Sequence, residues 1–354
     1  MQSCPAFIAG EWREISGVEK TPVYNPSRGE IIAEVPACTK EHVDLAVEAA
    51  ANAFPAWRDT PPVERARLFF RYRQLVEENF DRICQSVSRE HGKTLAEARG
   101  SAYRGIENIE YACSIPTLLM GDTLENLARG VDCETMLQPL GVCVGITPFN
   151  FPAMVPMWMF PLALACGNTF ILKPSEKVPL TALLIIELLE KAGLPKGVLN
   201  VVPGGRECVD ALLTHPKVKA ISFVGSSPVA KHIYETGTRR GKRVQANGGA
   251  KNYVVVMPDA DVARTVEALS TAAFGCAGER CMAGSTAVTV GKAAERVLPT
   301  LIEAARAIKV GPTDTKAQPD MGPVITAQHR DRVIHLVESS EKEGAKIIAD
   351  GRSV

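Results

Sequence analysis

Cys281 lies in a segment of small residues, where a substrate can reach a thiol. The segment reads Phe-Gly-Cys-Ala-Gly-Glu-Arg-Cys-Met-Ala-Gly over residues 274–284, and Arg280 directly precedes the cysteine. A neighbouring cation favours the thiolate, which is the nucleophilic form of cysteine. The alternative is a packed and inert thiol, because free cysteines are among the most buried residues. Cys281 is therefore a candidate nucleophile whose role depends on other segments.

Three further segments place polar or small residues at the ends of expected strands. Asn150 follows the first strand, and its side-chain NH2 could stabilise an oxyanion, although asparagine also forms turns and caps. Glu176, in Lys-Pro-Ser-Glu, could accept hydrogen bonds from a ribose diol and would favour NAD over NADP; an acid at a helix start is the alternative. Residues 223–227, Phe-Val-Gly-Ser-Ser, would let a pyrophosphate approach a helix N-terminus, but the full G-x-G-x-x-G fingerprint is missing.

Hydrophobic patterning indicates the elements that must position these residues. Residues 41–115 show helical spacing, and from residue 142 short β-rich runs alternate with helices. This alternation predicts an α/β fold with a parallel sheet, whose ligands bind at the carboxyl ends of the strands. The expected strands are 142–147, 169–173, 199–202, 220–224 and 243–246, and the helices between them include 180–192, 207–215 and 229–236.

A second α/β pattern begins near residue 248. It predicts strands at 253–257 and 287–290, helices from 261, near 293–308 and over 326–343, and a last strand within 346–350. The uncharged run 151–172 is long enough to span a bilayer, but three prolines interrupt it. We interpret this run as a buried helix followed by a central strand.

Composition excludes several classes of function. The 354 residues carry no net charge, so no basic excess exists for nucleic acid or an anionic membrane. The ten cysteines form no C-x-x-C pair and the six histidines are scattered, which favours reduced thiols and argues against a metal site. The N-terminus resembles neither a signal nor a transit peptide, so we expect bacterial cytoplasm, or the mitochondrial matrix if the source is eukaryotic.

Taken together, these motifs resemble those of the aldehyde dehydrogenase superfamily over the whole chain. The closest resemblance is to the CoA-acylating methylmalonate-semialdehyde dehydrogenases. The shared strings are Pro-Phe-Asn-Phe-Pro from residue 148, Lys-Pro-Ser-Glu from 173, Phe-Val-Gly-Ser from 223, Asn-Gly-Gly-Ala-Lys from 247 and Gly-Glu-Arg-Cys-Met-Ala from 278. The resemblance implies an aldehyde-dehydrogenase-like fold, with an NAD-binding domain over 1–247 and a partial catalytic domain over 248–354.

The resemblance also implies a role for each matching residue. Cys281 attacks the aldehyde carbon, and the Asn150 amide with the Cys281 N–H holds the oxyanion. Two arginines, which match Arg104 and Arg280, bind the substrate carboxylate. For Arg104 an equal alternative is an exposed arginine on a helix with no role in binding. The implied NAD contacts are Lys173 and Glu176 at the adenosine ribose, Ser226 at the pyrophosphate, and Thr147, Phe149, Lys177 and Gly248 along the cofactor path.

Asn247 departs from the hydrolytic members of the superfamily, which carry a water-activating glutamate there. An amide cannot act as a general base near neutral pH, whereas a thiol is intrinsically more nucleophilic than water. Coenzyme A is therefore the expected acyl acceptor. The resemblance adds loss of CO2, giving propionyl-CoA from methylmalonate semialdehyde and acetyl-CoA from malonate semialdehyde.

Family members continue well beyond residue 354, which indicates a C-terminally truncated chain. The full-length form is expected to be a homo-oligomer, a tetramer, that uses a hairpin near 121–139. Two alternatives stay open: a hydrolytic aldehyde dehydrogenase, and a truncated, non-catalytic NAD-binding fragment. For the isolated 354 residues we expect weakened NAD binding and little activity.

Overall fold

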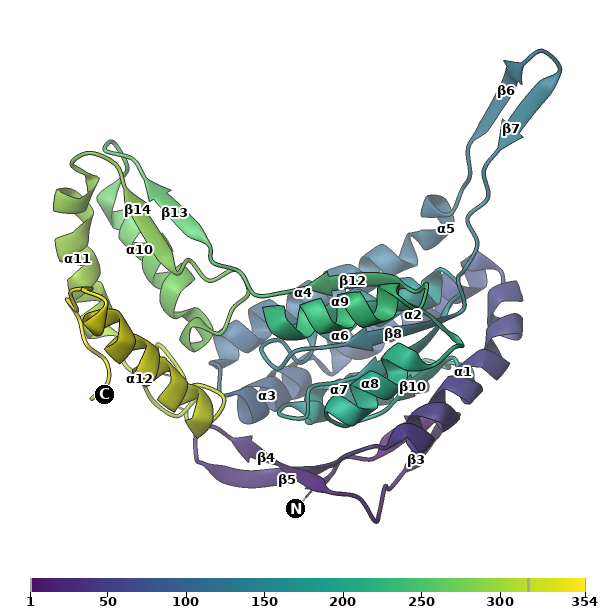
Figure 1. Cartoon of the computed structure of the whole chain (residues 1–354), viewed down its shortest axis with the longest axis horizontal. Coiled ribbons are helices and arrows are strands. Elements are labelled where there is room, and N and C mark those ends of the chain that lie inside the picture. The colour runs from purple at the N-terminus through teal and green to yellow at the C-terminus, as the bar shows by residue number, and fades with distance from the viewer. Residues whose placement is uncertain (1, 317–318, 354) are drawn as a thin grey trace. The chain divides into compact units, whose positions relative to one another are not determined.

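The computed structural model describes residues 2–316 and 319–353 and divides the chain into two compact units (Figure 1). The first unit comprises the chain up to Val23, Ile32–Cys84 and Arg99–Gly248. The second unit begins at Gly249, and the segments Tyr24–Ile31 and Gln85–Ala98 cluster with it.

The first unit is built on a seven-stranded sheet whose strand order is β12-β11-β8-β9-β10-β2-β3. Five of these strands run parallel, and the N-terminal strands β2 and β3 extend the sheet in antiparallel pairing. Strands β8 and β9 are buried along their whole length, as expected of β-rich runs covered on both faces. The bounds are β2 Ala6–Ile8, β3 Glu11–Arg13, β8 Val142–Ile146, β9 Thr169–Lys173, β10 Leu199–Val201, β11 Val218–Val224 and β12 Arg243–Asn247.

Helices cover both faces of this sheet. Val144 packs in a core cluster with α1 (Lys40–Asp59), α8 (Arg206–Thr214) and α9 (Ser227–Thr238). The next residue, Gly145, faces the other way, where an added Cβ would lie 3.0 Å from Met159 Sδ of α6 (Met154–Ala165). Helices α2 (Pro62–Glu78) and α7 (Pro179–Lys191) complete that side, α2 packing on both α6 and α7.

The uncharged run 151–172 forms the buried helix α6 and the strand β9, which confirms its interpretation from sequence. Trp57 at the end of α1 donates its indole N–H to the carbonyl of Leu164 in α6, over 3.0 Å. Among the described residues, no helix is both long and apolar enough to cross a membrane.

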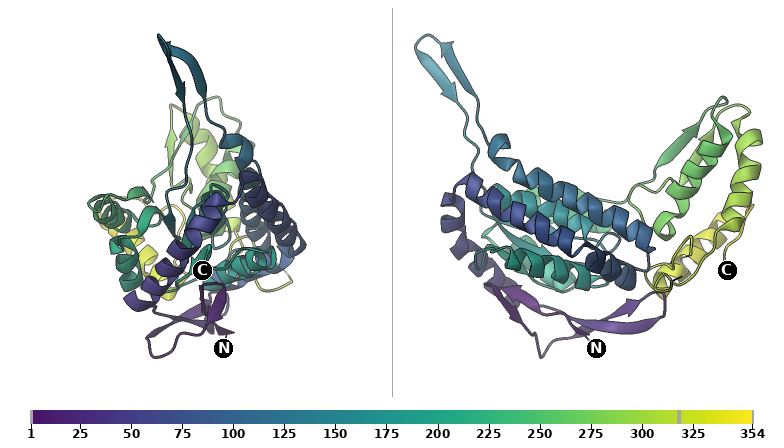
Figure 2. Two further views of the ribbon diagram at one scale, coloured as in Figure 1. Left: turned by 90° about the vertical axis from the view of Figure 1, so that its right-hand side faces the viewer. Right: turned by 180° about the vertical axis from the view of Figure 1, so that it is seen from behind.

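An antiparallel hairpin projects from the first unit, formed by β6 (Thr123–Ala128) and β7 (Val131–Glu134). It follows α3 (Phe80–His91), α4 (Leu95–Cys113) and the short α5 (Ile115–Leu118). Every residue of both strands is exposed, and two further views show the ribbon standing away from the helices of this unit (Figure 2). A hairpin is therefore present where the sequence predicts one.

The N-terminal region holds strands that sequence patterning did not predict. Besides β2 and β3, a small sheet has the order β1-β5-β4, with β1 at Gln2–Ser3, β4 at Lys20–Asn25 and β5 at Glu30–Pro36. These strands are two to seven residues long, too short to show a clear period.

The second unit contains a two-stranded parallel sheet, β13 (Tyr253–Val256) with β14 (Thr286–Thr289). Helix α10 (Val262–Phe274) begins at Asp261, whose carboxylate accepts the N–H of Arg264 over 2.9 Å. Helix α11 (Ala293–Ala307) contributes to a small core with α10 and β13, and α12 spans Ala327–Lys342. The element predictions for this part of the chain are confirmed up to α12.

The strand predicted within 346–350 is wrong, because the structure has a bend there. A strand needs a neighbouring strand for its backbone hydrogen bonds, and the carbonyl of Ile348 instead accepts Nη2 of Arg306 over 3.1 Å. The Ile348 side chain is 43% exposed, so its apolar character did not mark a core position.

Candidate active site

The first unit has a topological switch point between β8 and β11, where ligands of open α/β sheets bind. From β8 the chain continues to β9 and β10 on one side, and then returns to β11 and β12 on the other. Thr147 lies at the carboxyl end of β8 and is buried; its N–H donates to the carbonyl of Lys173 over 3.1 Å. Phe149 and Asn150 follow in the half-buried loop before α6.

Lys173 and Glu176 form an ion pair at the end of β9, with Nζ 3.1 Å from Oε2. The lysine is only 4% exposed, and it also donates to the carbonyl of Gly204 over 2.8 Å. Burial alone would raise the pKa of Glu176, but the Lys173 ammonium and a backbone hydrogen bond lower it below its ordinary value. The pair therefore presents a fixed carboxylate at the strand end.

Lys177 and Phe149 lie close to each other beyond the carboxyl ends of β9 and β8. The Lys177 Nζ lies 5.0 Å from the centre of the Phe149 ring, within the range of a cation–π contact. The Lys177 N–H donates to the hydroxyl of Ser175, which fixes the turn between β9 and α7. The loops after β8 and β9 are thus tied to each other.

Small residues bring the backbone close together at the ends of β11 and β12. A Cβ on Gly225 would lie 2.3 Å from the Phe223 ring, and a Cβ on Gly248 would lie 3.0 Å from the Ser227 hydroxyl. Ser226 is exposed and is the N-cap residue of α9. The Gly225 N–H donates to the carbonyl of Asn247 at the exposed end of β12, over 3.0 Å. An added side chain at either glycine would therefore crowd the backbone at the start of α9.

The Cys281 segment belongs to the second unit and follows a strained turn after α10. Cys276 and Ala277 both have positive φ, 52° and 54°, a region that non-glycine residues rarely adopt. Cys281 itself is half-buried. The Asn252 side-chain NH2 donates to the carbonyls of Cys281 and Ala283, over 2.9 and 3.0 Å. Sequence reasoning missed Asn252, which directly follows the Asn-Gly-Gly-Ala-Lys string that begins at residue 247.

Arg280 is held by three groups of the second unit. Its Nε donates to Cys276 Sγ over 3.3 Å, its Nη1 to the carbonyl of Thr271 over 3.2 Å, and its Nη2 to Glu97 Oε1 over 3.3 Å. Lys93 is buried close to the same groups; burial lowers the pKa of its ammonium, and Cys276 and Glu97 act in the opposite direction.

Arg104 lies on α4 within the first unit. Its side chain is 69% exposed and pairs with Glu107 over 2.9 Å, one turn along the helix. The structure thus places the expected NAD contacts at the carboxyl ends of the parallel strands in the first unit. Asn150 and Arg104 also lie in that unit. Cys281 and Arg280 lie in the second.

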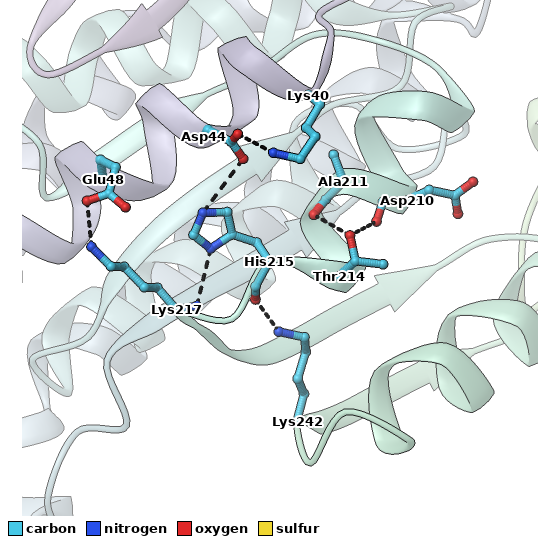
Figure 3. Close-up of polar contacts among 9 residues, drawn as sticks. All are labelled: Lys40, Asp44, Glu48, Asp210, Ala211, Thr214, His215, Lys217 and Lys242. Carbon is cyan, nitrogen blue, oxygen red and sulfur yellow. Dashed lines mark hydrogen bonds and ion pairs between the residues drawn. The ribbon is translucent and has the colours of Figure 1, made fainter.

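Two pockets lie apart from these residues. The first, about 250 Å³ in volume, is lined by residues of α1 and α8 around His215 (Figure 3). There His215 Nε2 lies 3.7 Å from Asp44, and Lys242 donates to the carbonyl of His215. The second lies between β13 and α10. Within 2–316 and 319–353, no cluster of His, Cys, Asp or Glu could hold a metal ion.

Comparison with known proteins decides the family. Residues 12–354 match the aldehyde dehydrogenase family. The chain belongs to the aldehyde dehydrogenase family. This confirms the resemblance that the five motifs indicated, and it assigns the aldehyde-dehydrogenase fold to the α/β architecture.

Related proteins carry semialdehyde names. The chain is 54% identical over 347 residues to a malonate-semialdehyde dehydrogenase of Pseudomonas aeruginosa, covering 98% of this chain and 69% of that protein. It is 47% identical over 348 residues to the human methylmalonate-semialdehyde/malonate-semialdehyde dehydrogenase [acylating], mitochondrial, covering 98% and 65%. The chain therefore spans about two thirds of the length of these relatives.

Solved structures of related proteins support the same family assignment. A methylmalonate-semialdehyde dehydrogenase from Oceanimonas doudoroffii superposes with a TM-score of 0.96 at 48% identity, over 100% of this chain and 72% of that one. A structure from Sinorhizobium meliloti 1021, assigned to the same enzyme and complexed with NAD, gives 0.97 at 43% identity, again over 100% and 72%.

Proposed function

We propose that the protein is an NAD-dependent, CoA-acylating dehydrogenase of malonate and methylmalonate semialdehyde. The observation that carries this proposal is the Cys281 segment, whose backbone is hydrogen-bonded by Asn252, in a chain that has Asn247 at the end of β12. The printed names of the relatives support the substrate class, and the word "acylating" in the human name supports a thiol acceptor.

The first unit offers groups that fit NAD. The Lys173–Glu176 pair supplies a cation and a fixed carboxylate for the adenosine ribose. Ser226 at the start of α9 suits a pyrophosphate, and Gly248 leaves room beside it. Thr147, Phe149 and Lys177 line the neighbouring strand ends. When bound, NAD supplies the acceptor for the hydride that the aldehyde carbon loses.

Cys281 performs the covalent chemistry in this proposal. Its thiolate attacks the aldehyde carbon, and the negative charge that develops on the aldehyde oxygen is stabilised by the Asn150 amide and the Cys281 N–H. Oxidation of this adduct leaves a thioester on Cys281. Arg280 and Arg104 bind the carboxylate of the semialdehyde, which a guanidinium can hold with two parallel hydrogen bonds.

Asn247 determines the acceptor of the acyl group. Its amide cannot take a proton from water near neutral pH, so hydrolysis of the thioester is slow. The thiol of CoA needs less help, because it is partly ionised and more nucleophilic. Transfer to CoA, with loss of CO2 from the acyl portion, yields propionyl-CoA or acetyl-CoA.

The test is NADH formation by a full-length counterpart, with and without CoA, across several semialdehydes. We expect steady turnover only with CoA, and Asn247→Glu should restore turnover without it. Equal rates with and without CoA would favour a hydrolytic enzyme. A lack of turnover together with NAD binding would favour a non-catalytic NAD-binding protein.

Assembly and location complete the proposal. The exposed hairpin β6–β7 carries Leu124, Leu127 and Val131, apolar side chains suited to a homo-oligomer interface, which we expect to be tetrameric. Bacterial cytoplasm is the expected location, with the mitochondrial matrix as its eukaryotic counterpart; the names of the human and Dictyostelium discoideum relatives include the word "mitochondrial".

A further inference from the structure

Glu97 uses its two carboxylate oxygens for two different tasks within the second unit. Its Oε2 accepts the N–H of Thr94 over 3.0 Å and the Thr94 hydroxyl over 3.1 Å, and the Thr94 hydroxyl accepts the Glu97 N–H over 3.3 Å. This reciprocal arrangement caps the start of α4 and is structural. Its Oε1 points to the segment that leads to Cys281, where it accepts from Cys276 and Arg280.

The first partner of Oε1 is a strained turn. The Cys276 N–H donates to Oε1 over 2.6 Å. Cys276 and Ala277 both occupy the left-handed region, which is unfavourable for any residue with a Cβ. Such a conformation persists only where its surroundings enforce it. The carboxylate of Glu97 is part of that enforcement.

The second partner is Arg280, whose guanidinium lies flat on the backbone of Gly275. A Cβ on Gly275 would lie 2.3 Å from the guanidinium carbon, so only glycine permits this placement. Nη2 donates to Oε1 of Glu97, whose side chain is 14% exposed, while the arginine side chain is 25% exposed. The salt bridge therefore fixes the direction of a guanidinium that still has N–H groups available.

We infer that Glu97 is a positioning residue for the Cys281 segment. Its Oε1 holds the turn at Cys276 and orients Arg280, so that a positive charge faces an anionic reagent or substrate approaching Cys281. Only the identification of that substrate as a carboxylate-bearing aldehyde rests on the proposed function.

The test is the alkylation of Cys281 by iodoacetate and by iodoacetamide, quantified on the Cys281 peptide by mass spectrometry. The ratio of the two rate constants reports the local positive charge, and it requires neither NAD nor turnover. Glu97→Ala should lower this ratio at least about threefold, because Arg280 loses its one ionic partner among the three groups that hold it and the turn at Cys276 loses its acceptor. Glu97→Gln should keep the ratio at or above the wild-type value, because its amide oxygen can still accept both hydrogen bonds while the competing negative charge is gone.

Controls separate positioning from folding. Thr94→Ala should lower the melting temperature but leave the ratio unchanged, because it removes the hydroxyl that caps α4 and touches no partner of Oε1. Glu110→Ala, which breaks an ion pair with Arg73 elsewhere on α4, should also leave the ratio unchanged. If Glu97→Ala does not fold, Glu97→Asp, shorter by one methylene, should lower the ratio.

A folded Glu97→Ala or Glu97→Asp protein with a wild-type ratio would overturn the inference, as would an equal fall in Glu110→Ala. These outcomes do not depend on whether CoA supports turnover, so failure of the proposed function would be seen separately.

Discussion

Replacing Lys173 by methionine tests the groups expected to hold the adenosine ribose. The change removes a buried ammonium that donates to the Gly204 carbonyl over 2.8 Å and pairs with Glu176 over 3.1 Å. A buried carbonyl left without a donor costs about 1–3 kcal/mol. Because the Glu176 side chain is 38% exposed, we count the lost ion pair at no more than about 1 kcal/mol. The free energy of unfolding should therefore fall by about 1–4 kcal/mol at pH 7.

The pH dependence of this loss has a definite sign. In the wild type the pKa of Glu176 is below its ordinary value, so its contribution to stability is present above the unfolded pKa and is lost as the pH falls through the folded pKa. Without Lys173, burial is opposed only by a backbone hydrogen bond and the charge of Lys177, so the pKa of Glu176 is higher in the variant than in the wild type and the carboxylate is protonated at a higher pH. The difference between the two proteins should shrink as the pH approaches 4.

The assay is chemical denaturation at pH 7 and near pH 4, with NAD titration at pH 7, where the variant should bind at least about tenfold more weakly. Lys191→Met is the control, because Lys191 forms an exposed ion pair with Glu187 and should change neither quantity. A loss of stability below about 0.5 kcal/mol, or one that is the same at both pH values, would refute the reasoning.

Three further predictions concern other parts of the chain. Asn252→Asp places a carboxylate against two carbonyl oxygens, so alkylation of Cys281 by iodoacetamide should slow about tenfold while NAD affinity is kept; an unchanged rate would contradict the role of Asn252. Burial lowers the pKa of Lys242 to about 8, with help from nearby cations, so the folded state binds fewer protons than the unfolded state between pH 8 and 10.5. The wild type should therefore gain stability over Lys242→Met as the pH rises through this range; a constant difference in denaturation midpoints would argue otherwise. Asn247→Glu should make NADH formation independent of CoA, and a variant that still requires CoA would show that another group decides the acceptor.

The parallel strands and their helices could be predicted because their signals are local. Strand β8 reads as a continuous β-rich run, and Asp261 marks the start of α10 as a side-chain cap. The strands β2 and β3 gave no such signal, since each has three residues and depends on partners far along the chain. The apolar residues near Ile348 gave a false strand signal, because an apolar run becomes a strand only where another strand can pair with it.

The candidate site also contains some residues that could be predicted from sequence and others that could not. The motif residues could be named from sequence because their types and order were present in the printed chain. Their supports could not, because Glu97 lies 183 positions from Arg280 and Asn252 lies 29 from Cys281. The strain at Cys276 and Ala277 was also invisible, since alanine and cysteine give no hint of a left-handed backbone. Only the folded chain shows which distant side chain holds a reactive segment.

The most direct measurement of the central claim is mass spectrometry of Cys281 in a full-length counterpart incubated with NAD and a semialdehyde. Without CoA an acyl group should accumulate on Cys281, and addition of CoA should discharge it within the turnover time. Cys281→Ala should carry no acyl group. An acyl group on another residue, or one on Cys281 that disappears equally fast without CoA, would contradict the account.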